Sequence, residues 1–173
     1  MCNLDGWQSP LPKEWLSSQA ALQEQIVARE REFNMRPVLP AFAGHVPAAL
    51  KRVYPNIKTT RVSEWGGFAD QYRCTFLNPM DSLYAIIQKE YLTEQTRLYG
   101  TNHIYGIDPF NEIDPPSWDA DSLGMMAKHI YESVAAVDPE AVWLQMTWLF
   151  YADIKHWTTP RIKSYLRSVP QDR

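Results

Sequence analysis

Apolar residues recur at helical spacing in four segments of the chain, which we predict to be helices. The first is the charged segment 12–34, and the second spans 83–98 and ends before Gly100, a residue typical of helix ends. The third begins near Asp119 or Asp121 and stops at Asp138-Pro139, and the fourth begins at Thr159-Pro160. The expected apolar stripes are Trp15, Leu22, Ile26 and Phe33; Leu83, Ile87, Tyr91 and Leu98, with Ile86 beside them; Leu123, Met126, Ile130, Val134 and Val137; and Ile162, Tyr165, Leu166 and Val169.

Short apolar runs alternate with these helices. They predict three strands, near 37–42, 103–108 and 141–147. Short buried strands that alternate with amphipathic helices are typical of a parallel sheet with helical crossovers. The sequence therefore predicts an α/β fold.

Long loops follow the predicted strands, whereas the loops before the strands are tight. The long loops are 43–80, with room for a short helix at 47–53, then 108–118 and 147–158. Ligands of α/β proteins bind at the carboxyl ends of the strands, where these loops begin. Chemistry is therefore expected in these three segments.

Three strands cannot close a barrel, and a complete (β/α)8 barrel takes roughly 200 residues or more. A fourth strand would be due after the last helix, where this sequence ends at Arg173. A small open sheet is one alternative. The pattern favours the other, in which residues 1–173 form a single segment of a partial (β/α)8 TIM barrel whose exposed face is apolar.

The composition excludes several classes of protein. The chain has 173 residues, 45% of them hydrophobic and 13% aromatic, which is enough to build a core. With 17 basic and 20 acidic residues and no basic run, a nucleic-acid partner is not expected. No apolar run approaches the roughly 20 residues of a membrane-spanning helix, so no membrane partner is expected either. The first residues, Met1 to Trp7, lack the features of a signal peptide.

The pair Asn111-Glu112 is the main candidate for catalysis, because it follows the second predicted strand by a few residues. Between Phe110 and Trp118, desolvation would raise the pKa of the Glu112 carboxyl, as a general acid requires. The Asn111 amide could donate a hydrogen bond to a substrate hydroxyl. The alternative is a solvated loop glutamate beside a turn-forming asparagine.

Three further side chains are candidate ligand contacts. Trp65 and Trp148 could stack on a sugar ring, although ordinary packing would also explain them. His45 could contact substrate or make a structural hydrogen bond. His129 and Glu132 lie one helical turn apart, but their order is the reverse of Glu-x-x-His and no second helix repeats the pair, so no metal is expected there. Cys2 and Cys74 could form one bridge or remain free thiols.

Several long motifs occur in the order found in glycoside hydrolase family 89, the alpha-N-acetylglucosaminidases. They are VLPAFAGHVP at 38–47, YGIDPFNEIDPP at 105–116, AVDPEAVWLQ at 136–145 and WLF at 148–150. Gly6-Trp7, Pro10-Leu11-Pro12 and Trp15 extend the resemblance to the start of the sequence. Motifs of this length, met in sequence order, are far more specific than any single one.

The resemblance implies a retaining glycosidase with a (β/α)8 catalytic barrel. Its activity would be exo-hydrolysis of terminal N-acetyl-α-glucosamine from heparan-sulfate-like glycans. Glu112 would be the general acid/base and Asn111 a sugar contact, while Trp65 and Trp148 match aromatic residues that line the sugar pocket. The implied partner is a glycan with terminal N-acetylglucosamine, and a homo-oligomeric parent enzyme is left open. The resemblance also implies no metal or organic cofactor.

The chain also departs from the family pattern. Asp70 stands where animal members have the first cysteine of a pair, so Cys74 is expected to be free or paired elsewhere. The family's nucleophilic glutamate belongs to a later strand, which implies an internal piece of the catalytic barrel that is inactive alone.

Relatives are lysosomal in animals and secreted or periplasmic in bacteria, so we expect a lysosomal or secreted protein. The alternatives are a non-catalytic sugar-binding fragment and another Asn-Glu barrel glycosidase of different specificity.

Overall fold

The computed structural model describes residues 11–64, 66–111 and 113–173. Its helices agree with the four predicted ones to within a few residues. None of the helices in these ranges combines the length and apolar character needed to cross a bilayer. The helices are α1 (Lys13–Glu32), α2 (Leu50–Val53), the 3₁₀ helix η1 (Asp70–Tyr72), α3 (Ser82–Tyr99), α4 (Ala120–Ala135), α5 (Trp148–Ala152) and α6 (Thr159–Arg167).

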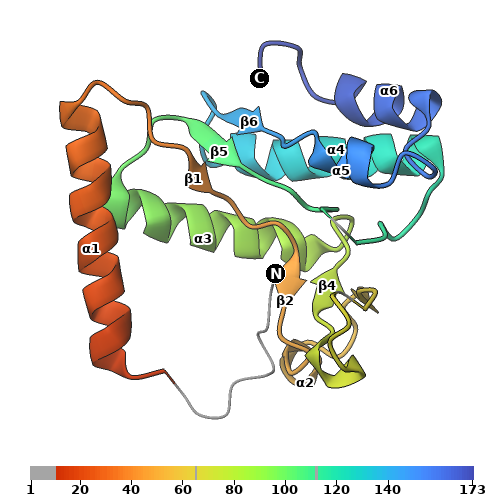
Figure 1. The fold of residues 1–173 in the computed structure, drawn as a ribbon, viewed down its shortest axis with the longest axis horizontal. Helices are drawn as coiled ribbons and strands as arrows, with labels where there is room; N and C mark the ends of the chain where they lie inside the picture. Colours follow the sequence, from red (N-terminus) through yellow and green to blue (C-terminus); the bar gives the residue numbers. More distant parts are fainter. Residues whose placement is uncertain (1–10, 65, 112) are drawn as a thin grey trace.

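Three strands form a parallel sheet, as the sequence predicts. They are β1 (Leu39–Pro40), β5 (Ile104–Gly106) and β6 (Val142–Leu144), in the order β1-β5-β6. Both pairings are parallel, with Leu39 opposite Tyr105 and Tyr105 opposite Trp143. The prediction of an α/β arc with about three parallel strands and flanking helices is confirmed (Figure 1).

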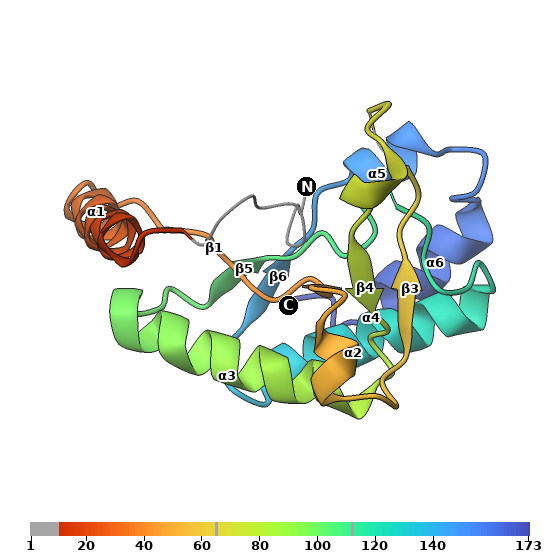
Figure 2. The same ribbon diagram turned by 90° about the horizontal axis from the view of Figure 1, so that it is seen from below.

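The two faces of the parallel sheet differ in burial. Tyr105 is buried in one cluster with residues of α3 and α4, which lie on the same side of the strands (Figure 2), and its partner Leu39 is also buried. Leu144 follows Trp143 in β6 and therefore points to the other face, where it is 45% exposed. Val38 directly before β1 and Met146 two residues after β6 are 43% and 48% exposed. The expected exposed apolar face of the arc is confirmed.

Local signals at the helix ends act as expected. Asp119 caps α4, because its carboxylate accepts a hydrogen bond from the Ser122 backbone N–H. Asp81 caps α3 in the same way through Leu83 N–H. Gly100 ends α3 with φ +67°, a backbone conformation that glycine adopts without strain.

The buried face of α3 differs from the predicted stripe. Ile86 and Tyr91 are exposed, whereas Gln88 and Gln95 are buried. Gln95 Nε2 donates a hydrogen bond to the Pro40 carbonyl at 2.7 Å. This buried amide therefore pairs with a backbone carbonyl of the edge strand β1. Apolar periodicity cannot detect a buried face that carries amides.

Helix α1 stands at one end of the molecule (Figure 1) and buries little of its predicted stripe. Val27 is its buried residue, while Trp15 and Phe33 are 48% and 62% exposed. Its carboxyl end is tied to α3, because Arg31 donates to the Tyr99 carbonyl at 2.7 Å. The expected apolar face of α1 is thus present but mostly uncovered.

The long segment after β1 contains a second sheet that the sequence did not predict. Its strands are β2 (His45–Val46), β3 (Thr59–Arg61) and β4 (Thr75–Leu77), in the antiparallel order β2-β4-β3. Strands of two or three residues are too short to show alternation in a sequence. This small sheet lies beyond the carboxyl end of β1, on the side where ligands are expected.

Candidate active site at the carboxyl ends of the strands

His45 begins the small sheet and packs its ring edge-on against Phe76 of β4, with 5.6 Å between ring centroids. Its Nδ1 atom is buried and has no hydrogen-bond partner among the described residues. Burial lowers the pKa of His45, which favours the neutral imidazole. A neutral imidazole has one N–H donor and one nitrogen acceptor, and a hydroxyl group can pair with either.

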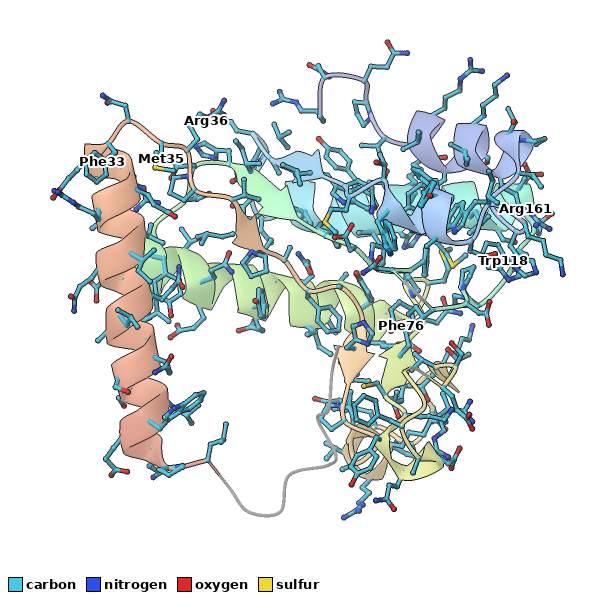
Figure 3. All side chains as sticks on the ribbon, viewed as in Figure 1. Phe33, Met35, Arg36, Phe76, Trp118 and Arg161 are labelled. Atoms are coloured by element: carbon cyan, nitrogen blue, oxygen red, sulfur yellow. The ribbon has the colours of Figure 1, made fainter. Side chains whose placement is uncertain are left out.

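Asn111 lies on the loop that follows β5. The preceding residue, Phe110, is 1% exposed and packs against Phe76 at 5.8 Å between centroids. The Asn111 Oδ1 atom is buried and, within the described chain, also lacks a partner. Phe76 thus packs against both His45 and the loop of Asn111, at the junction of the small sheet with the rest of the molecule (Figure 3).

Two predicted site residues, Glu112 and Trp65, lie outside the described residues, so their roles stay predictions. The loop on either side of position 112 belongs to one apolar cluster. Phe110 is a buried member of that cluster, and Ile113 packs against it.

Asp108, two residues after the end of β5, joins the ends of two strands and was not among the predicted site residues. Its Oδ1 accepts hydrogen bonds from Met146 N–H at 2.9 Å and from Gln145 Nε2 at 2.5 Å. The Gln145 Oε1 atom in turn accepts from the Tyr165 hydroxyl at 3.0 Å. Burial raises the pKa of Asp108, and the Met146 N–H partly opposes that rise. The signal that could have found the network is two polar residues at the carboxyl ends of neighbouring strands.

Trp148 begins α5, just beyond β6. Its ring is 45% exposed and lies 5.5 Å from the ring of Tyr151, which is 74% exposed. An exposed aromatic pair at the carboxyl end of a strand could stack on a sugar face. The placement agrees with the predicted contact, and the role itself stays a prediction.

Trp118 anchors the far end of the loop after β5. Its ring stacks on His156 at 5.1 Å and meets Trp157 edge-on at 5.4 Å, and the Arg161 guanidinium lies over it at 5.5 Å (Figure 3). The loop of Asn111 is therefore fixed at its start by Asp108 and at its end by Trp118. Such fixing from both ends is what a preorganised site needs.

Other candidates from the sequence take no part in this arrangement. Within the described ranges, no group of three or more His, Cys, Asp or Glu side chains could hold a metal ion. Glu132 lies 3.7 Å from Lys128 in an ion pair one turn away on α4. Cys74 is a half-buried free thiol, and Cys2 lies outside the described residues.

The similarity of this chain to known structures extends over most of its length. It matches the family 89 glycoside hydrolase of Clostridium perfringens in complex with 2-acetamido-1,2-dideoxynojirmycin, with a TM-score of 0.76 and 24% identity. The match covers 94% of this chain and 18% of that one. The same enzyme in complex with its substrate GlcNAc-alpha-1,4-galactose matches with a TM-score of 0.76 at 22% identity. At this identity the likeness concerns the fold.

Sequence similarity is more specific. The chain is 44% identical over 174 aligned positions to human alpha-N-acetylglucosaminidase, covering 100% of this chain and 23% of the human protein. It therefore spans under a quarter of that relative. The alpha-N-acetylglucosaminidase (NAGLU) TIM-barrel domain model matches residues 1–173. With the parallel β1-β5-β6 arc and the loops at its carboxyl ends, this match shows that the chain belongs to the family of alpha-N-acetylglucosaminidase TIM-barrel domains.

Proposed function

We propose that the protein carrying this chain is a retaining exo-glycosidase that removes terminal N-acetyl-α-glucosamine from heparan-sulfate-like glycans. The observation that carries the proposal is the 44% identity, over the whole chain, to human alpha-N-acetylglucosaminidase. His45 Nδ1 and Asn111 Oδ1 support it, because both are buried without a hydrogen-bond partner among the described residues and sugar hydroxyls would satisfy both atoms. The proposed compartment is the lysosome or the outside of the cell.

Glu112 has the central role in the proposed mechanism. Its carboxyl protonates the departing glycosidic oxygen as the bond to the anomeric carbon breaks. The resulting carboxylate then removes a proton from the water that attacks the glycosyl-enzyme intermediate, which restores the acid and releases the sugar. His45 and Asn111 would orient the sugar through its hydroxyls, with Trp65 and Trp148 beside its apolar face.

A retaining mechanism needs a second carboxyl group, the nucleophile, about 5–5.5 Å from the first. The resemblance to the family implies that this glutamate belongs to a later strand, outside these 173 residues. The Clostridium perfringens complex with GlcNAc-alpha-1,4-galactose is of a variant with two glutamates replaced by glutamine, which supports a mechanism of two carboxyl groups. We accordingly expect the 173-residue polypeptide, prepared alone, to have no hydrolytic activity.

The test is Glu112→Gln in the whole polypeptide that contains this chain. An amide cannot protonate a leaving group, so hydrolysis of a glycan with a poor leaving group should fall about 10²–10⁴-fold. An aryl glycoside whose leaving group needs no proton should form the glycosyl-enzyme with little loss. Steady-state and burst kinetics on the two substrates measure the difference.

Glu90→Gln is the matched control, because it makes the same change at an exposed position of α3. It should leave both rates near those of the wild type. If Glu112→Gln lowers both substrates equally together with thermal stability, Glu112 is a structural residue and the proposed role is wrong. If the unaltered whole polypeptide binds N-acetylglucosamine and hydrolyses neither substrate, the alternative of a non-catalytic sugar-binding protein holds.

A further inference from the structure

A pocket of about 620 Å³ lies between α2 and the small antiparallel sheet. Among the described residues, its wall contains four cationic side chains and no aspartate or glutamate. Two threonine hydroxyls add neutral hydrogen-bond donors. The residues that matter are Lys51 and Arg52 of α2, Arg61 and Thr59 of β3, and Arg73 and Thr75 near and on β4.

Two of the cations are held in place before any ligand arrives. Asp70 binds both, with its carboxylate 2.8 Å from Arg61 Nη1 and 3.0 Å from Arg73 Nη1. Arg73 also donates through Nε to the Val62 carbonyl at 2.7 Å. The hydrogen bond from Arg73 and the charge of Arg61 hold the pKa of Asp70 below its usual value, so the bridge stays ionised near neutral pH. Fixed guanidinium groups bind oxyanions with less loss of side-chain entropy.

The pocket keeps a positive excess, because among the described residues Asp70 pairs with only two of its four cations. Lys51 and Arg52 are exposed, and no carboxylate among the described residues pairs with them. Chain folding creates this cluster from positions 51 to 73 that are separated by apolar and polar residues. That separation explains why the sequence shows no basic run.

The pocket opens on the face of the small sheet opposite His45. His45 is paired with Phe76, whereas Arg61 is paired with Thr75, and neighbouring residues of a strand point to opposite faces. The pocket and the candidate active site are therefore two surfaces of one substructure. A polymer bound at its terminal sugar could reach the second surface with residues further along.

We propose that this pocket binds sulfate groups of an acidic saccharide at a site separate from the one for the terminal sugar. The choice of a saccharide rests on the proposed function, and the choice of an oxyanion rests on the lining. Guanidinium groups bind tetrahedral oxyanions through paired hydrogen bonds, and threonine hydroxyls complete such a shell. The volume suits one or two sugar units.

The test measures binding of a size-defined heparin hexasaccharide to the whole polypeptide by isothermal titration calorimetry. Lys51→Ala/Arg52→Ala should weaken binding at least about 10-fold, because each charge-assisted contact contributes on the order of a tenfold change in Kd. Wild-type affinity should also fall as salt is raised. Neither side chain makes a hydrogen bond or ion pair within the described chain, so the fold should persist.

Lys163→Ala/Arg167→Ala is the matched control, since it removes the same charges from exposed positions of α6, far from α2 in Figure 1. It should bind the hexasaccharide within about twofold of wild type. Equal weakening by both variants would overturn the proposal, as would equal affinity for a DNA oligonucleotide of the same charge or for a hexasaccharide stripped of sulfate. Hydrolysis of an aryl N-acetyl-α-glucosaminide by the wild type is measured in a separate assay. Loss of this hydrolysis would contradict the proposed function, whereas an unchanged hexasaccharide affinity in Lys51→Ala/Arg52→Ala would contradict the proposed pocket.

Discussion

At the scale of single residues, Gly44 sets how closely the small sheet approaches the candidate site. Its φ is +108°, and a Cβ there would lie 2.5 Å from Cε2 of Phe76, a ring that packs on His45 and Phe110. Gly44→Ala combines backbone strain with a clash against a buried ring. We expect it to lower the free energy of unfolding by about 2–4 kcal/mol, measured by urea denaturation.

Gly67→Ala separates those two effects. Gly67 has φ +73°, and a Cβ there would meet no atom within 4 Å among the described residues. This variant should lose only the strain energy, about 1–2 kcal/mol. An equal loss in the two variants would mean that contact with Phe76 does not restrict position 44.

At the scale of elements, Asp138 ties the loop between α4 and β6 to the start of β5. Its carboxylate accepts from Tyr105 Oη at 2.7 Å and contacts His103 Nδ1 at 2.8 Å. Burial would raise the pKa of Asp138, but these hydrogen bonds outweigh it and hold the pKa below its usual value. The ionised carboxylate therefore stabilises the fold above the pKa of the unfolded chain, and this stabilisation is lost as pH falls through the folded pKa.

Asp138→Asn should accordingly lower the free energy of unfolding by about 1–3 kcal/mol at pH 6, where buried bonds to a charged group are lost. The difference from wild type should begin to shrink below about pH 4, where Asp138 of the unfolded wild type takes up a proton, and should shrink further as pH falls toward the lowered folded pKa. Urea titrations from pH 6 to pH 3 measure it. A gap that stays constant with pH would mean that the charge of Asp138 contributes nothing.

The sequence predicted the longer elements because their periodicity and caps agree. Asp119 starts α4 and Gly100 ends α3 as expected, and the three parallel strands lie inside the predicted ranges. The small sheet was missed because strands such as β2 have two residues. The Asp108–Gln145 bond joins residues 37 positions apart, so only the folded chain reveals it.

At the scale of the whole molecule, the arc leaves uncovered the surfaces that a closed barrel buries. One is the inner face of the parallel sheet, with Leu144 45% exposed. Another is α1, where Trp15, Leu22 and Ile26 are 48%, 50% and 42% exposed. This chain covers 23% of human alpha-N-acetylglucosaminidase, and in a closed barrel both faces would contact neighbouring elements.

The isolated 173-residue polypeptide should therefore self-associate, because exposed apolar patches of this kind associate in water. Leu144→Gln/Met146→Gln places polar side chains on the inner face of the sheet and should shift the polypeptide toward monomer, with a dissociation constant raised about 10-fold or more. Sedimentation velocity over a concentration series measures the shift. Ile154→Gln is the control, since it makes the same kind of change at a position that is 76% exposed and lies in the segment between α5 and α6, not next to the sheet strands in sequence. A wild type that stays monomeric, or a control that dissociates the assembly equally, would show that the sheet face does not drive association.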